Sequence, residues 1–279
     1  LFVALPFPLM NGIDFALLKF CLEHNDSPNV QESVLTERDP EDYAWLQKVM
    51  NSIPSPVEQM KKCIEILSTD PDEGAKINAL ELLQDLVEDI DIANDLAILG
   101  LGEVSKAMVY KMNEENDNEQ AAKVRMMACW VMSTIAQNNP TSQDAIIKQG
   151  VLPIVIAILE QSKHQKVTQK ALAIVSAMTR DCPVGQTYFA QHQEVIITTL
   201  KKLLNSEDSN LVMKACVVLR HLCHAKESIK TAAINANLVP VLTQHMDNSE
   251  DESVREMANL ALQELASRVN DKETLNQVS

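Results

Sequence analysis

The segment VTQKALAIVSAM, residues 167–178, is the clearest indication of the fold of this chain, because its pattern returns in LVMKACVVLRHL at residues 211–222. Both stretches carry apolar residues four positions before, four after and seven after a central alanine, which is Ala171 or Ala215. Apolar residues at those offsets line one face of an α-helix. The two stretches are therefore predicted to be equivalent helices of an internal repeat.

The same pattern occurs five times along the chain. The central alanines are separated by 49, 43, 44 and 43 residues and are Ala79, Ala128, Ala171, Ala215 and Ala258. Every position at the three flanking offsets is apolar in all five copies. Spacings of about 40 to 47 residues are typical of armadillo and HEAT repeats. A small residue at the centre of each helix lets neighbouring helices approach closely.

A second apolar helix is predicted before each long helix. GVLP at 150–153 opens one apolar run, NLVP at 237–240 opens another, and residues 195–204 occupy the equivalent place between them. Proline is favoured in the first turn of a helix, where its missing N–H has no partner to lose. Polar loops are predicted before the long helices at residues 113–120, 161–166, 205–210 and 247–252. A short helix is predicted before these two, so each repeat has three helices, which favours armadillo over HEAT.

These patterns predict an all-α fold: a right-handed superhelical solenoid of armadillo-like repeats with a helical N-terminal cap. The repeat array is predicted at residues 57–270, with long helices centred on the five alanines. Amphipathic stretches at 15–21 and 43–50 predict a helical N-terminal segment over residues 15–56. A poorly ordered start is expected at 1–14 and a frayed tail at 271–279. Only 6 of the 279 residues are glycine, which disfavours turn-rich β folds.

The net charge indicates which binding partners are not expected for this chain, and the cysteine content indicates its cellular compartment. The net charge of −15 repels nucleic acids and anionic membranes, so neither is an expected partner. No apolar run reaches the ~18 to 20 residues that cross a bilayer. The six cysteines form no C-x-x-C pair, so we expect free thiols in a reducing compartment. The apolar start lacks a basic segment before it and a cleavage site after it, which favours the cytoplasm over secretion.

The sequence contains no catalytic or cofactor-binding signature. Gly100 and Gly102 have no third glycine nearby, so they do not make a phosphate-binding loop. On a helix His221, Cys223 and His224 point in different directions, so they are not expected to hold one metal ion. The chain is therefore predicted to be a non-enzymatic binding scaffold without a cofactor, and its function should come from its surface.

Basic residues gather on the long helices of this acidic chain. They are Lys123, Arg125, Lys170, Lys214, Arg220 and Arg255. Ordinary solvation of the helices is one interpretation. A groove for an acidic, folded partner is the other. Positions one before, two after and six after the central alanine are expected to point away from the core. In that set Trp130 is the only tryptophan, which disfavours a reader of extended peptides.

Four motifs resemble the armadillo-type nucleotide exchange factors of the cytosolic seventy-kilodalton heat-shock chaperone. They are LLKFCLEH at 17–24, DYAWL at 42–46, LVEDIDIANDL at 86–96 and AQNNP at 136–140. The resemblance runs from about residue 15 to about residue 265. The third motif is the most specific, because armadillo families share the periodicity alone.

The resemblance implies a concave face that grips the chaperone's ATPase domain, pries its lobes apart and releases ADP. It places Ala93 and Lys214 on the contact surface, although Ala93 could equally be a small residue at a crowded turn. With the basic and aromatic residues above, the predicted partner-binding residues are Ala93, Asn94, Arg125, Trp130, Lys170, Lys214, His221 and Arg255. A monomer is expected.

Two alternatives stay open at this point. An armadillo adaptor would bind another partner without affecting nucleotide. A luminal exchange factor of the same architecture would serve the endoplasmic reticulum chaperone. The final residues, NQVS at 276–279, contain no retention signal, which favours the cytoplasmic interpretation.

Overall fold

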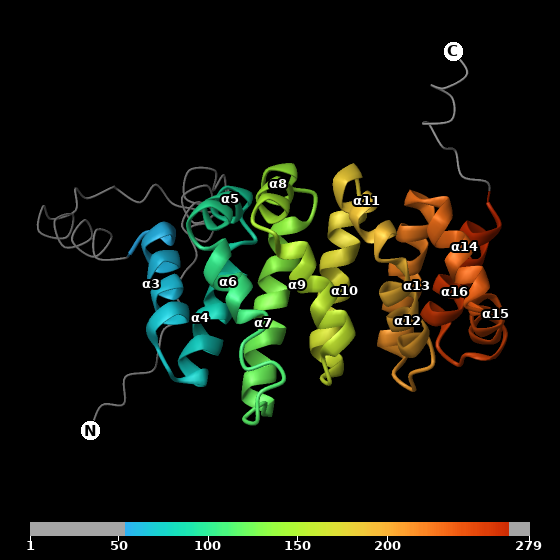
Figure 1. Ribbon diagram of the computed structural model, residues 1–279, viewed down its shortest axis with the longest axis horizontal. Helices are drawn as coiled ribbons and strands as arrows, with labels where there is room; N and C mark the ends of the chain where they lie inside the picture. Colours follow the sequence, from blue (N-terminus) through green and yellow to red (C-terminus); the bar gives the residue numbers. More distant parts are fainter. Residues whose placement is uncertain (1–53, 268–279) are drawn as a thin grey trace, which may run out of the picture. The chain divides into compact units, whose positions relative to one another are not determined.

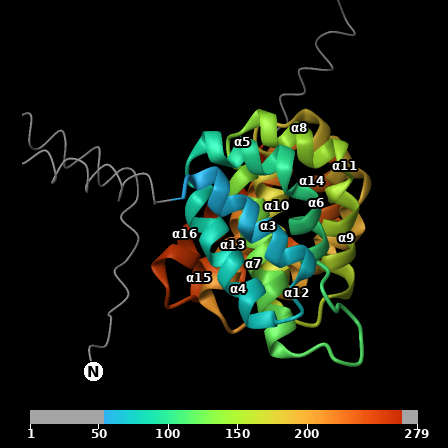
Figure 2. The same ribbon diagram turned by 90° about the vertical axis from the view of Figure 1, so that its left-hand side faces the viewer.

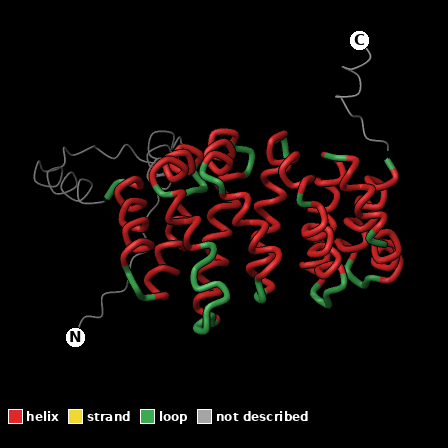
Figure 3. Tube along the Cα trace, viewed as in Figure 1, coloured by secondary structure: helices red, strands yellow, loops and turns green. Residues whose placement is uncertain are grey.

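The computed structural model describes residues 54–267, which form fourteen α-helices and no β-strand (Figures 1 and 3). In chain order the helices are α3 (Pro56–Thr69), α4 (Glu73–Leu86), α5 (Ile90–Leu99), α6 (Leu101–Ala107), α7 (Glu119–Ala136), α8 (Pro140–Lys148), α9 (Val151–Gln161), α10 (Gln165–Thr179), α11 (Pro183–Gln191), α12 (Gln193–Leu204), α13 (Ser209–Ala225), α14 (Glu227–Asn235), α15 (Leu238–Asn248) and α16 (Glu252–Ala266). The predicted start at 1–14, segment 15–53 and tail at 271–279 lie outside the described residues.

Helices α5 to α16 fall into four groups of three, preceded by the pair α3 and α4. The last helix of each group packs on the last helix of the next, so that α4, α7, α10, α13 and α16 form one layer (Figure 1). The view along the row shows α5 and α8 at the top and α9 at the right-hand side (Figure 2). The predicted all-α solenoid of three-helix, armadillo-like repeats is confirmed.

The five aligned alanines are buried in this layer, as the periodicity predicts. Ala79 is 4% exposed and the other four are fully buried. Each lies near the middle of a long helix, where a larger side chain would push the neighbouring helix away. The hydrophobic core is continuous through the described repeats and is built mainly from aliphatic residues, alanine and methionine.

Two of the second helices, α9 and α15, start with a residue in the left-handed conformation. Gly150 before α9 has a φ of 70° and Asn237 before α15 has a φ of 64°, both in the left-handed region. Glycine and asparagine tolerate this conformation best. Pro153 and Pro240 follow in the first turn of α9 and α15, as expected. The second helices α6 and α12 start differently, because Gly100 before α6 has a φ of −134° and His192 before α12 has a φ of −110°.

The long helices begin one or two residues earlier than predicted. Helix α7 starts at Glu119, inside the predicted loop 113–120, and α13 starts at Ser209, inside 205–210. The side chains of Asn118 and Asp208 accept hydrogen bonds from amides of the first turn. These polar residues are helix caps, so part of each polar run belongs to the helix end.

The five described cysteines, Cys63, Cys129, Cys182, Cys216 and Cys223, are free and buried, as predicted for residues 54–267. Burial raises the pKa of the Cys129 and Cys216 thiols to about 12, so they stay protonated and unreactive. No single helix among the described residues is long and apolar enough to cross a membrane. Together α8 and α9 meet those limits, but they are bent by 78°.

Candidate partner-binding surface

Four predicted residues lie on the exposed side of the layer of long helices. They are Trp130 on α7, Lys170 on α10, and Lys214 and His221 on α13. We call this side the third-helix face. Trp130 is 39% exposed, and the Lys170 ammonium lies 3.6 Å from the centre of its ring. A cation over an indole face is attracted by the ring's quadrupole, so this pair fixes both side chains at the surface.

Lys170 and Lys214 occupy equivalent positions, each directly before the central alanine of its helix. Burial lowers the pKa of Lys170, and the positive charge of Lys214 lowers it further. Lys214 itself is exposed. The two ammonium groups are thus close enough to repel each other, and an anionic group of a partner would relieve that repulsion.

A pocket of about 290 Å³ opens on this face between α10 and α13. It is lined by Gln137, Asn138, Gln169, Leu172, Ala173, Ser176, Ala177, Arg180, Leu203, Leu211, Lys214, Val217 and Val218. Small residues of α10, Ala173, Ser176 and Ala177, leave the space that larger side chains would fill. The two charged residues of the lining, Arg180 and Lys214, are both basic.

His221 connects the two helices at the pocket's edge. Its Nδ1 lies 2.9 Å from the Ser176 hydroxyl, and its Nε2 lies 3.5 Å from the Arg180 guanidinium. Burial lowers the pKa of His221, and the positive charge of Arg180 lowers it further. The imidazole is therefore neutral at pH 7, and the positive charge of this rim comes from Arg180 and Lys214.

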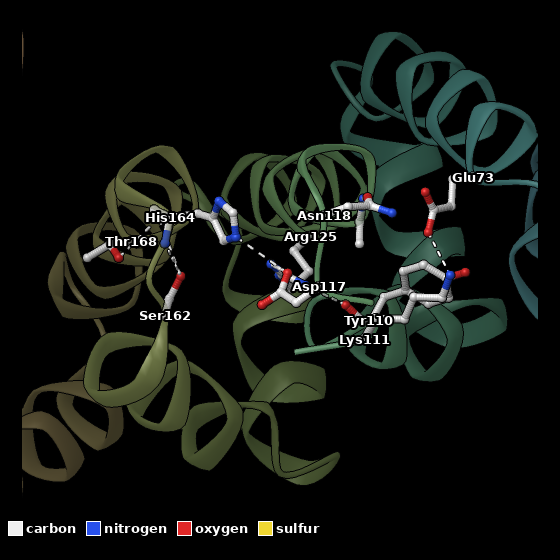
Figure 4. A network of polar contacts seen from close by, with 10 residues as sticks. Glu73, Tyr110, Lys111, Asp117, Asn118, Arg125, Ser162, His164 and Thr168 are labelled. Atoms are coloured by element: carbon white, nitrogen blue, oxygen red, sulfur yellow. Dashed lines mark hydrogen bonds and ion pairs between the residues drawn. The ribbon is translucent and has the colours of Figure 1, made fainter. Parts of the chain in front are cut away.

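Arg125 was predicted to lie on the partner-binding surface, but its side chain lies inside the protein. It has no exposed area, and its guanidinium donates to the Tyr110 carbonyl at 2.7 Å and to Asp117 at 2.5 Å (Figure 4). His164 lies 3.4 Å from the same carboxylate. Burial raises the pKa of Asp117, but its hydrogen bond and ion pair with Arg125 outweigh that effect and lower it. Arg125 holds the loop 108–118 in place.

Arg255 and Lys76 act similarly in other repeats. Arg255 Nη1 donates to the Ser249 carbonyl at 2.7 Å and to that of Glu250 at 3.2 Å. Lys76 Nζ donates to the Leu67 carbonyl at 2.6 Å. Lys76, Arg125 and Arg255 each stand three residues before the central alanine of their helix. We call them the anchoring column, since each binds carbonyls at the end of the preceding helix or loop.

The remaining predicted residues lie on α5. Ala93 is 3% exposed and lies near the start of α5. Asn94 is half-buried, and its Oδ1 accepts a hydrogen bond from the Ser142 hydroxyl of α8 at 3.3 Å. Two positions expected to point outward, Met127 and Ala177, are buried by neighbouring helices. Whether the exposed members of the predicted set contact a partner stays a prediction.

Comparison with known families gives two matches that together extend over most of the chain. Residues 15–96 match the model described as nucleotide exchange factor Fes1. Residues 107–264 match the model described as the SIL1/FES1/HPBP1 C-terminal domain. The second match alone spans more than half of the chain and includes α7 to α15 completely.

Curated relatives carry related names. The chain is 27% identical over 170 residues to the Hsp70 nucleotide exchange factor FES1 of Coccidioides immitis, covering 59% of this chain and 76% of that protein. It is 28% identical over 193 residues to Hsp70-binding protein 1 of Rattus norvegicus, covering 64% of this chain and 52% of that protein. The chain thus spans about half the length of the mammalian relative.

Solved structures confirm the architecture. An engineered protein shares 20% identity with a TM-score of 0.62, covering 75% of this chain and 79% of that one. A designed armadillo repeat protein in complex with the peptide (KR)4 shares 16% identity with a TM-score of 0.57, covering 81% and 95%. At such low identity the likeness shows the fold alone.

Proposed function

Because this chain belongs to the SIL1/FES1/HPBP1 family, we propose that it is a nucleotide exchange factor for a seventy-kilodalton heat-shock chaperone. It binds the chaperone's ATPase domain through the third-helix face and promotes release of ADP. The observation that carries the proposal is the pair of family matches at residues 15–96 and 107–264, with relatives named for this activity.

The geometry supports a mechanism by population shift. An array with a continuous core and interlocked helices deforms little, so it favours whichever partner conformation fits its surface. A scaffold that binds the open ATPase domain more tightly than the closed one increases the open fraction, from which ADP dissociates. The acceleration depends on that difference in affinity and needs no catalytic group on the scaffold.

Charge supports the choice of face. The chain carries 39 acidic and 24 basic residues, yet Lys170, Lys214 and Arg180 gather on the third-helix face. Complementary charge speeds encounter with an acidic partner and fixes its orientation. The chain acts as a monomer in the cytoplasm, where its buried thiols stay reduced. It uses no cofactor and binds neither nucleic acid nor membrane.

The test measures release of a fluorescent ADP analogue from the isolated ATPase domain of the chaperone, with increasing amounts of the full chain. The rate should rise and saturate, and the chain alone should hydrolyse no ATP. An unchanged release rate at concentrations where the two proteins bind would overturn the proposal. Tight binding to a linear peptide together with unchanged release would favour an armadillo adaptor instead.

A further inference from the structure

We propose that the pocket between α10 and α13 receives one apolar side chain of the chaperone that stands beside a carboxylate. The inference rests on the proposed function, because it assigns the anchor point of the same interface. Its occupant is a protein segment in which a large aliphatic or aromatic residue neighbours an aspartate or glutamate.

The walls of the pocket are suited to an apolar group. The apolar lining consists of Leu172 and Ala173 of α10, Val217 and Val218 of α13, and Leu203 in the last turn of α12. The volume of about 290 Å³ lies just below the ~300 to 1,000 Å³ of pockets that hold small ligands. A space of this size can receive an inserted side chain of a protein partner, and such buried anchors contribute most of the binding energy of an interface.

The charged residues at the rim of the pocket favour a negatively charged group beside the inserted side chain. Arg180 and Lys214 stand on it, and no aspartate or glutamate contributes to its lining. This is a strong local bias in a chain of net charge −15. Lys170 lies three residues before Ala173 on the same side of α10 and adds a further positive charge. A carboxylate next to the inserted side chain would meet these cations.

A second pocket in the array lacks this selectivity. It lies between α9 and α12 and is larger, about 690 Å³. Its charged lining residues are Glu160, Lys163, Glu194 and Lys202, two acidic and two basic. Mixed charge gives no preference for an anionic partner. The second pocket therefore provides a control site at which no anionic partner is expected.

Filling the first pocket is the direct test. Val217→Trp places a large side chain where the partner's would insert, and it should weaken binding to the isolated ATPase domain by about tenfold or more. The stimulation of ADP release should fall in parallel. The matched control is Thr198→Trp in the second pocket, which should bind and stimulate like the parent chain. Thermal unfolding of both variants checks that each is folded.

The rim gives a second test that does not alter packing. Lys214→Gln and Arg180→Gln should each weaken binding by about three- to tenfold at low salt, with a smaller effect as salt rises. A photocrosslinking residue at position 217 should then capture a chaperone segment with an apolar residue adjacent to Asp or Glu. Capture of a segment without a carboxylate would overturn the stated chemistry.

The outcomes separate the two proposals. If the parent chain neither binds the ATPase domain nor stimulates release, the proposed function is wrong. If the parent chain does both and Val217→Trp, Lys214→Gln and Arg180→Gln match it, the exchange activity stands and the pocket is not its anchor.

Discussion

The anchoring column and the third-helix face both place basic residues on the long helices, but they use the charge differently. Arg125 has no exposed surface and binds a carbonyl and a carboxylate, whereas Lys214 is exposed and lines an apolar pocket. The two positions, three and one before the central alanine, are about 200° apart around a helix. Two residues along the helix thus separate a cation that binds groups inside the protein from one that a partner can reach.

The difference shows that charge by itself does not mark a binding surface. The anchoring column faces loop and helix ends, whose carbonyls lack partners within the helix. A cation there satisfies internal acceptors and is not free to bind another molecule. On the third-helix face, Lys214 is exposed, and the ammonium of Lys170 lies over the Trp130 ring.

The largest expected change in stability comes from a substitution in the anchoring column. Arg125→Met leaves Asp117 without its guanidinium partner in a mostly buried position, and it should lower the free energy of unfolding by about 3 to 5 kcal/mol. Chemical denaturation measures this change. Lys123→Met is the control on the same helix, and its exposed side chain should change stability by about 0.5 kcal/mol or less. Equal effects of the two substitutions would contradict the distinction.

A smaller loss is expected where the helices pack closely. Ala171→Leu should overpack the buried centre of α10 and lower the free energy of unfolding by about 1 to 3 kcal/mol. Ala173→Leu, two residues later, points into the open pocket and should change stability by about 0.5 kcal/mol or less. If Ala173→Leu costs as much as Ala171→Leu, the space between α10 and α13 is not available to a partner.

Charge reversal contrasts the two surfaces directly. Arg255→Glu removes hydrogen bonds to two carbonyls and should cost about 1 to 3 kcal/mol of stability. Lys214→Glu should change stability by about 0.5 kcal/mol or less but weaken chaperone binding, because it repels an acidic partner. Unfolding and binding assays separate these results. Lys163→Glu, in a loop, controls for the change in net charge, and a loss of binding there would place the partner on another face.

The smallest expected effect concerns pH. The pKa of folded His221 lies below its usual value of 6.5 because burial and Arg180 disfavour the protonated ring. As pH falls through about 6.5, the unfolded chain takes up a proton that the folded chain still excludes, so stability falls. His221→Asn should reduce this loss between about pH 7.5 and 5.5. An unchanged pH profile would mean that other groups dominate the acid sensitivity.

Sequence periodicity predicts much of the repeat architecture because the faces of a helix are set by local spacing. The offsets around Ala171 and Ala215 predict which residues are buried, and the positions of Pro153 and Pro240 predict the second helices. The loops were less well predicted, since Asn118 and Asp208 are equally typical of a loop and of a helix cap. Composition does not tell the two apart.

The anchoring column could have been recognised by aligning one more position. Lys76, Arg125 and Arg255 recur three residues before the alanine, while Thr168 and Val212 stand there in the other two repeats. A repeated basic residue on an otherwise buried side of the helix indicates an internal acceptor. Without the repeat alignment at this position, Arg125 and Arg255 look like ordinary members of a basic groove.

The repeat, its helices and the family resemblance are all readable from the amino-acid sequence, because they depend on residues close together in the chain. Only the packing of the repeats in three dimensions shows that Ala93 is buried and that a pocket opens between α10 and α13. Those features depend on contacts between segments tens of residues apart. Whether a side chain at such a position contacts a neighbouring helix or lines an open pocket depends on how closely the repeats stack, and the spacing of residues within one helix does not set that distance.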